Sequence, residues 1–404
     1  MLSDADEMTT KSAFPDAPRL SLERVAAFRL SNHHLANRAA RGSVARVAGD
    51  MAGVQAQILS AAEISLWART RDLRAEHVKQ ALWKDRTLVR VWCMRGTTHL
   101  VPSEDFAVFV RGCTRRAQRD TRWLARAGRP LDVVDRLVDA VGRVLDRPLT
   151  RKELARRLVD GFGRKRRIRI DRGWGGRGDV DAVELGGLTM SIGGILSVAC
   201  LRGVACAGPP RGNETTFVRP DAWLRDWKDR PIEEAEDELL RRYLHAHGPA
   251  TVRDFATWTY MTAADAREIW DRAGDGLAPV MAEGRPAWTL RADVRSLERA
   301  TIEPPVVRLL PSFDSFLLGQ KDKSHLVDPA HYKRVYRAQG WLSPAVLVDG
   351  RVAGTWSYAQ DRAQFGVRIE GFKTLPPVVR SRIREEAEDL GRFFDRPDVV
   401  VKFA

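Results

Sequence analysis

The sequence predicts an α+β protein built from three tandem winged-helix modules, each a helix-turn-helix followed by a β-hairpin, with a small β-rich module after them. Two observations predict the repeats: a helix-start signature that recurs about 100 residues later, and three apolar hairpins with glycine in the turn. A third predicts the last module, because alternating apolar residues replace the helical pattern from about residue 306. At 404 residues the chain also exceeds what one hydrophobic core normally holds.

The helix-start signature marks the first helix of two helix-turn-helix units. The run Leu-Thr-Arg-Lys-Glu-Leu-Ala at 149–155 returns as Ala-Thr-Val-Arg-Asp-Phe-Ala at 250–256. A threonine followed three residues later by an acid forms a capping box, in which the two side chains bind each other's backbone N–H groups. Each copy lies between two helical runs, so Thr150 and Thr251 are the predicted helix N-caps.

The predicted hairpins complete the winged helices. Their turns lie at 95–96, 210–212 and 283–286, and each turn is polar and contains glycine, as hairpin turns require. We therefore expect a disordered leader at 1–18, a first module at 19–147, a second at 148–230 and a third at 231–303.

The C-terminal module, at 304–404, has a different pattern. Strands are predicted at 306–313, at 341–358 as a hairpin turned at 348–351, at 365–369 and at 399–403. A helix is predicted from about residue 377 to residue 394. This arrangement is typical of a small β-rich α+β module.

Charge and composition restrict the partners. The net charge of +14 and the isoelectric point near 10.1 favour a polyanion, nucleic acid above all, although an arginine-rich composition is also typical of a GC-rich genome. The four cysteines form no Cys-x-x-Cys pair, so we expect reduced thiols, a cytoplasmic location, and neither a metal nor a cofactor. The N-terminal segment has no apolar core typical of a signal peptide, and no apolar run is long enough to span a membrane.

Two glutamines stand out because a buried amide without partners costs roughly 1–3 kcal/mol. Gln55 and Gln57 lie in the run Gly-Val-Gln-Ala-Gln at 53–57, and Arg-Gly-Thr-Thr-His follows at 95–99. Together these runs resemble the AlkZ-like (AlkZ/YcaQ) winged-helix DNA glycosylases, and Leu-Leu-Pro-Ser-Phe-Asp at 309–314 is a further family-like run. The resemblance implies a fold of three tandem winged helices and cleavage of the glycosidic bond of alkylated purines in DNA. It also implies that Gln55 and Gln57 are the catalytic pair.

The chemistry of amides agrees with such a substrate. A glutamine has no useful pKa, so it holds a water or a sugar in place rather than transferring a proton. That is sufficient when the leaving group is already cationic, as N7-alkylguanine is, because the ring departs as a neutral base and leaves an oxocarbenium-like sugar. Other relatives carry Asp in place of the second glutamine, so Gln57 argues against general-base catalysis and for dependence on cationic lesions.

Residues two apart point to different sides of a helix, about 200° apart, but share one side of an extended segment. Both glutamines reach one substrate only if their segment is extended, kinked or at a helix end. The alternative is a buried helix containing Val54, Ile58 and Leu59, with the glutamines at its solvent edges.

Other motif residues have two interpretations each. His99 is either a hydrogen-bonded structural residue or part of the active-site cleft, and Arg95 and Thr97 either contact phosphate or stabilise the hairpin. Asp314 is a minor candidate for orienting a site residue. The glutamine motif contains no lysine, which argues against Schiff-base chemistry and strand cleavage and so implies a monofunctional glycosylase.

Two basic segments are candidates for phosphate contact, although each can also be a solvated surface. The first segment, residues 164–169, is predicted to be a flexible loop, with Arg172, Trp174 and Arg177 beyond it. The second is a helix after the first hairpin, which also contains Arg122. The predicted DNA-binding residues, besides Arg95, are Arg111, Arg115, Arg116 and Arg119 on the helix and Arg164, Lys165, Arg166, Arg167 and Arg169 in the loop.

The predicted function is a monofunctional DNA glycosylase for bulky or crosslinked N7-alkylguanine in double-stranded DNA, acting in the cytoplasm at the nucleoid. We expect a monomer with no obligatory protein partner and no membrane association. By analogy with some relatives, its role is self-resistance to a DNA-alkylating natural product. Two alternatives remain: a winged-helix transcription regulator, which normally dimerises on two half-sites, and a non-catalytic lesion-binding protein.

Overall fold

The computed structural model describes residues 14–119, 131–171, 177–225, 227–360 and 364–404. The chain divides into two compact units. Unit 1 comprises Met1–Val78, Leu240–Trp258 and Ala263–Ala404, and unit 2 comprises Lys79–Leu239 and Thr259–Thr262. Both contain helices and small sheets, which confirms the predicted α+β class. No described helix is both long enough and apolar enough to cross a membrane.

The N-terminal part of unit 1 consists of short helices that surround one strand. The elements are α2 (Leu22–Asn32), α3 (Val44–Asp50), β2 (Val54–Gln55) and α4 (Leu59–Trp67), followed by α5 (Ala75–Trp83), which ends in unit 2. Every residue of α4 from Ala61 to Trp67 is buried. A helix buried on all sides is rigid, so α4 provides a stable support for the segment just before it.

A winged helix forms the second part of unit 1. Its helices are α13 (Val252–Thr259) and α14 (Ala263–Ala273), and its wing pairs β11 (Leu277–Ala282) with β12 (Arg285–Leu290). Helix α12 (Ile232–His247), which begins in unit 2, precedes them in the chain. The predicted Thr251 cap is confirmed, because the backbone N–H of Asp254 donates to its hydroxyl while the Asp254 carboxylate accepts from the Thr251 N–H. The wing turns at residues 283–284, as predicted. Helix α15 (Val294–Arg299) and strand β1 (Arg19–Leu20) pack with it.

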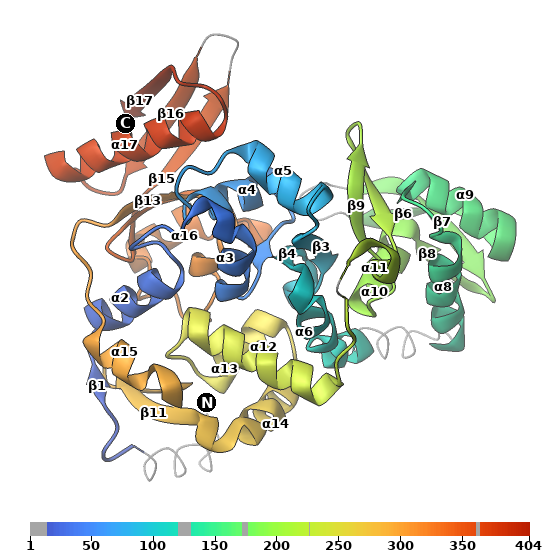
Figure 1. Cartoon of the computed structure of the whole chain (residues 1–404), viewed down its shortest axis with the longest axis horizontal. Helices are drawn as coiled ribbons and strands as arrows, with labels where there is room; N and C mark the ends of the chain where they lie inside the picture. The colour runs from blue at the N-terminus through green and yellow to red at the C-terminus, as the bar shows by residue number, and fades with distance from the viewer. Residues whose placement is uncertain (1–13, 120–130, 172–176, 226, 361–363) are drawn as a thin grey trace. The chain divides into compact units, whose positions relative to one another are not determined.

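The C-terminal sheet has the strand order β13-β14-β15-β16-β17. The strands are β13 (Val307–Leu310), β14 (Ala345–Val348), β15 (Arg351–Gln360), β16 (Phe365–Gly371) and β17 (Val399–Phe403). All pairs are antiparallel except β16 with β17, which are joined through α17 (Pro377–Phe393). Figure 1 shows α17 lying along this sheet, in red. The predicted strands, hairpin and helix are confirmed.

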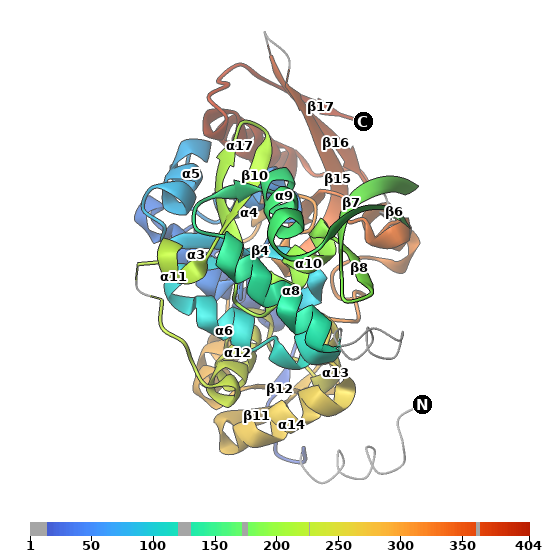
Figure 2. The ribbon, with the colours of Figure 1, turned by 90° about the vertical axis from the view of Figure 1, so that its right-hand side faces the viewer.

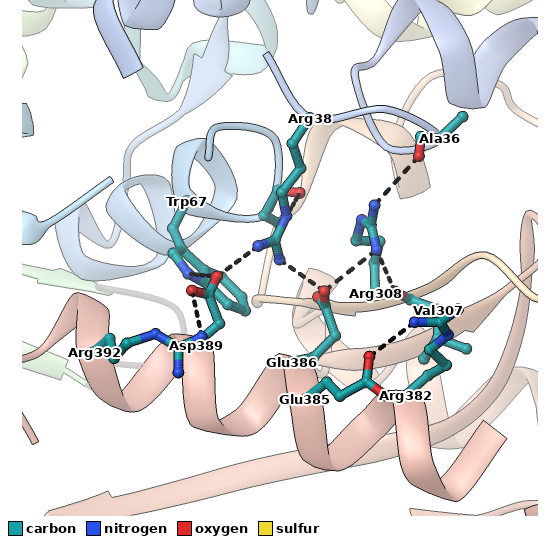
Figure 3. A network of polar contacts seen from close by, with 11 residues as sticks. Ala36, Arg38, Trp67, Val307, Arg308, Arg382, Glu385, Glu386, Asp389 and Arg392 are labelled. Carbon is teal, nitrogen blue, oxygen red and sulfur yellow. Dashed lines mark hydrogen bonds and ion pairs between the residues drawn. The ribbon is translucent and has the colours of Figure 1, made fainter. Parts of the chain in front are cut away.

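Helix α17 is attached to the N-terminal helices by partly buried charges (Figure 3). The Arg38 guanidinium donates to Glu386 at 2.8 Å and to Asp389 at 2.5 Å, and the indole of Trp67 donates to Asp389 at 3.0 Å. Arg308, in β13, donates to Glu386 at 3.3 Å. The Arg38 and Trp67 contacts join segments more than 300 residues apart in sequence and hold the C-terminal module against α4.

Unit 2 contains two hairpins of the predicted winged-helix type. One pairs β3 (Leu88–Trp92) with β4 (Thr98–Pro102) and leads to α6 (Phe106–Arg111). The other pairs β9 (Cys206–Arg211) with β10 (Glu214–Val218), and β10 also pairs with β5 (Leu149–Thr150). The predicted capping box at the start of α9 (Arg151–Phe162) is confirmed, with Thr150 and Glu153 bound reciprocally. Helices α8 (Leu131–Val144), α10 (Ile192–Leu201) and α11 (Pro220–Trp223) also lie in unit 2.

A third sheet in unit 2 was not predicted. Strands β6 (Arg164–Asp171), β7 (Arg177–Leu185) and β8 (Leu188–Ser191) form an antiparallel sheet, visible beside α9 in Figure 2. The expectation of a flexible loop at 164–171 is therefore wrong. Its residues pair one by one with β7, and Arg167 and Arg169 alternate with isoleucines, so backbone hydrogen bonds order the segment despite its charge. Arg172 and Trp174 lie outside the described residues.

Candidate active site

The glutamine pair lies where a strand ends and a buried helix begins. Gln55 is the last residue of β2, with 6% of its surface exposed, whereas Gln57 is exposed at a bend two residues before α4. The alternative of a single buried helix containing Val54 and Leu59 is therefore wrong. The segment bends at residues 57–58 between the end of β2 and the start of α4, so it is kinked and at a helix end, as the glutamine spacing requires.

Two residues with left-handed backbone turn the chain from α3 into β2. Ala52 has φ 54° and Gly53 has φ 90°, and the Gly53 N–H donates to the Ala48 carbonyl at 2.8 Å. A Cβ is costly in this region, so glycine at position 53 removes part of the strain. The Ser315 hydroxyl donates to the Gly53 carbonyl at 2.9 Å, which ties this turn to the 313–319 loop of the same unit.

Asp314 is fully buried, and its carboxylate accepts four hydrogen bonds. Arg69 donates to its two carboxylate oxygens at 2.7 and 2.8 Å, the Ser65 hydroxyl donates at 2.6 Å and the Phe316 N–H donates at 3.0 Å. Neither charged side chain has exposed surface. Asp314 therefore positions the loop whose next residue, Ser315, holds the glutamine turn, and it is not exposed to a substrate.

Two buried histidine rings, those of His33 and His247, lie next to this ion pair. The His33 ring accepts a long hydrogen bond from Arg69, at 3.5 Å through Nδ1, and its centroid lies 5.0 Å from that of His247. Burial, followed by the proximity of His247 and Arg69, lowers the pKa of His33 well below its usual value. A Cβ on Gly319 would overlap the His247 ring, so the 313–319 loop fits closely over these residues.

The Arg-Gly-Thr-Thr-His run forms the turn and the first part of β4 in unit 2. Arg95 and Gly96 have φ values of 52° and 68°, and the Arg95 guanidinium donates to Nε2 of His99 at 2.9 Å. Because arginine only donates, Nδ1 of His99 carries the proton and donates to the Thr97 carbonyl at 3.2 Å.

His99 has no exposed surface, and burial, followed by Arg95, lowers its pKa well below the usual value. A buried, neutral imidazole whose two ring nitrogens are both hydrogen-bonded within the protein does not act as a proton donor or acceptor for a substrate. Of the two interpretations, the structure therefore favours the structural one: His99, Arg95 and Thr97 stabilise the hairpin.

Most of the arginines predicted on the helix after the first hairpin are engaged within unit 2. Arg111 donates to Asp229 at 2.7 Å, and Arg115 donates to the buried Glu236 at 2.7 Å. Arg116 is 6% exposed and donates to the Cys93 carbonyl at 2.7 Å. The expectation that Arg115 and Arg116 contact DNA is not supported, because their guanidinium groups are hydrogen-bonded to Glu236 and to the Cys93 carbonyl. Arg122 lies outside the described residues.

The basic residues of β6 remain exposed. Arg164, Lys165, Arg167 and Arg169 have exposed side chains, and Arg166, also exposed, is paired with Glu184. Asp181 and Asp179 lie opposite Arg167 and Arg169 in the register of the sheet. Strand β6 therefore presents cationic side chains to solvent, and acidic residues of β7 partly balance their charge.

Sequence reasoning missed Arg69, Ser65 and Ser315. The available signal was Arg69 itself, a charged residue directly after the apolar run that ends at Trp67 and Ala68. Such an arginine, when buried, requires a carboxylate partner. Asp314 was singled out, but only the tertiary structure brings the two together across 245 residues.

Most of this chain matches a known protein family. The sequence profile described as "DNA glycosylase AlkZ-like" matches residues 48–393, a range that contains both motifs and Asp314. The chain belongs to the AlkZ-like DNA glycosylase family. The predicted resemblance is confirmed, and DNA is the substrate that membership of this family implies.

A curated protein and a solved structure that are similar to this chain both come from Streptomyces sahachiroi. The "Interstrand DNA cross-link repair glycosylase" is 34% identical over 347 residues, which cover 84% of this chain and 88% of the relative. The solved structure "Streptomyces sahachiroi DNA glycosylase AlkZ" superposes with a TM-score of 0.79 at 29% identity, covering 96% of this chain and 100% of that one. The match to an AlkZ-like structure confirms the α+β winged-helix fold class.

Proposed function

We propose that this AlkZ-like glycosylase hydrolyses the N-glycosidic bond of N7-alkylated guanine in DNA and does not cleave the strand. The observation that carries the proposal is the placement of Gln57, exposed at a bend directly before a buried helix, two residues after Gln55. A straight helix would point these two side chains to different sides, whereas a kinked segment at a helix end allows both amides to face one nucleotide.

The substrate supplies most of the driving force. An N7-alkylated guanine carries a positive charge, and breaking the C1′–N9 bond releases a neutral base and leaves positive charge on the sugar. Fixed amide oxygens stabilise that charge as it develops, and the same amides hold the water that attacks C1′. The proton of this water passes to solvent, because residues 53–58 contain no ionisable side chain.

Two restrictions follow from the residue types. A glutamine at position 57 does not activate water as a carboxylate would, so neutral adducts, which leave poorly, should be released slowly. The motif also contains no amine to form a Schiff base with the sugar, which supports a monofunctional reaction.

The exposed cations of β6 are the proposed phosphate contacts, because they are ordered on a sheet and only partly paired. The relative's name, an interstrand crosslink repair glycosylase, supports extending the substrate to crosslinked guanines. We further propose that the protein acts as a monomer at the nucleoid, in self-resistance to an alkylating natural product.

The test is release of base from an oligonucleotide duplex with a single N7-alkylguanine, scored as alkali-labile abasic sites. Wild type is compared with Gln55→Ala, Gln57→Ala and the double variant. Gln360→Ala, an exposed glutamine on β15, is the matched control. We expect release by wild type and control, and release near the spontaneous rate in the double variant with DNA binding retained.

Other outcomes assign other functions. Binding without release by wild type, across several adducts, contradicts the enzyme and favours a lesion-binding protein. Preference for one undamaged sequence over lesion-containing DNA favours the transcription regulator. Cleavage of the strand without alkali contradicts the monofunctional assignment.

A further inference from the structure

Tyr260 is a bulky residue in a backbone conformation that normally belongs to glycine. It directly follows α13, has φ 68°, and is 55% exposed. A left-handed residue after a helix is most often glycine, because a Cβ is strained there. The segment Thr259–Thr262, unlike the rest of α13, groups with unit 2.

Folding alone does not explain the tyrosine. The ring lies on the guanidinium groups of Arg119 and Arg116, at 4.9 and 5.7 Å from its centroid. An exposed cation–π contact stabilises less than a bulky left-handed residue costs, and a ring with more than half of its surface exposed buries little apolar area. Strained residues that the core does not require are concentrated at functional sites.

The Tyr260 ring lies close to the Arg-Gly-Thr-Thr-His run at 95–99, and Arg116 contacts both. Arg116 donates to the Cys93 carbonyl at 2.7 Å, and a Cβ on Gly96 would lie 2.6 Å from its Nη2. Arg116 therefore fills the space between Tyr260 and the turn of the Arg-Gly-Thr-Thr-His run. The ring is placed, through one buried arginine, beside the sequence that identifies this family.

We infer that Tyr260 is a DNA-stacking residue, whose exposed ring contacts the face of an unpaired or distorted base of the substrate duplex. Aromatic rings beside cations are the usual platform for a base, since every base has a π face and a cation attracts the adjacent phosphate. Here that cation is Arg119, because the Arg116 guanidinium is buried against the Cys93 carbonyl. The inference deepens the proposed function, because it rests on DNA being the substrate and adds the residue that holds the deformed strand.

The decisive variant is Tyr260→Gly, which removes the ring and relieves the backbone strain together. Tyr260→Phe retains the stacking face, and Tyr332→Ala, another exposed tyrosine, is the matched control. Binding is measured by fluorescence anisotropy on a duplex carrying one N7-methylguanine, over a range of salt concentrations. A 2-aminopurine placed beside the lesion reports stacking through quenching of its fluorescence.

We expect Tyr260→Gly to unfold at no lower denaturant concentration than wild type and to bind the duplex about tenfold or more weakly. The dependence of log Kd on log salt should be unchanged, because no charge is lost. The 2-aminopurine signal should respond to wild type and Tyr260→Phe but not to Tyr260→Gly.

Two results overturn the inference: wild-type affinity with an unchanged 2-aminopurine response in Tyr260→Gly, or a loss of stability in that variant, which would make the ring structural. Failure of the proposed function is distinguishable. In that case wild type releases no base, while the ring-dependent binding and the 2-aminopurine response remain.

Discussion

Asp314 and Arg69 form a bidentate ion pair at 2.7 and 2.8 Å with no exposed surface on either side chain. Ser65 and the Phe316 N–H complete the coordination of the carboxylate. Since Ser315 is the next residue and binds the Gly53 carbonyl, this pair sets the position of the backbone two residues before Gln55. The exposed glutamine motif is therefore supported by a fully buried polar network.

Replacing the carboxylate should be severe. Asp314→Asn leaves the Arg69 charge buried without a counter-ion, so we expect the free energy of unfolding to fall by about 3–5 kcal/mol. The control is Asp395→Asn, which breaks the exposed Arg74–Asp395 pair and should cost at most about 1 kcal/mol. Urea denaturation measures both, and equal losses would contradict the role assigned to the buried pair.

The hydroxyl of Ser315 should affect activity more than stability. Ser315→Ala removes one hydrogen bond, a loss of about 1 kcal/mol, but frees the Gly53 turn from the 313–319 loop. Small displacements of positioning groups can cost up to about 100-fold in rate, so single-turnover base release should fall well beyond the loss of stability. Ser312→Ala, directly before this loop, is the control. Unchanged release by Ser315→Ala would contradict the link.

The backbone of Gly53 gives a second test of the turn. Gly53→Ala puts a Cβ at φ 90° and should destabilise the protein by about 1–2 kcal/mol, with slower base release because Gln55 is displaced. Gly42→Ala is the control, since an added Cβ there meets no atom within 4 Å and the change should stay within about 0.5 kcal/mol. Thermal denaturation and the abasic-site assay are the measurements.

Acid should destabilise the fold before its carboxylates titrate. Burial lowers the pKa of His33 and His99 well below the usual value and that of His325 to about 3. In the unfolded chain these histidines take up protons below about pH 6.5, whereas the folded protein does not, so stability is lost as the pH falls from about 6.5.

Each such histidine contributes up to about 1.4 kcal/mol per pH unit to this loss. Urea unfolding between about pH 5 and 7.5 measures the slope. In His325→Gln the free energy of unfolding should change less steeply with pH below about pH 6 than in wild type, because one fewer proton is taken up on unfolding. An identical slope in the two proteins would show that His325 is protonated in the folded state.

Local features were predictable because they depend on neighbours in sequence. The capping boxes at Thr150 and Thr251, the turn at Gly96 and the C-terminal hairpin are all determined by residues a few positions apart, and the structure contains each of them. The basic run at 164–169 was misread as a loop, because its partner strand β7 is separated from it by glycine-rich sequence without a strand signature. Cross-strand pairing, rather than composition, ordered it.

By itself, the sequence determined that the chain is a winged-helix protein of the AlkZ-like family, with Gln55 and Gln57 as its candidate catalytic residues. Only the tertiary structure decided that Gln55 is buried and Gln57 exposed, that His99 is buried and hydrogen-bonded to Arg95, and that Asp314 neutralises Arg69. The physical reason is that burial sets the energy of polar groups, and burial depends on contacts between residues far apart in the chain.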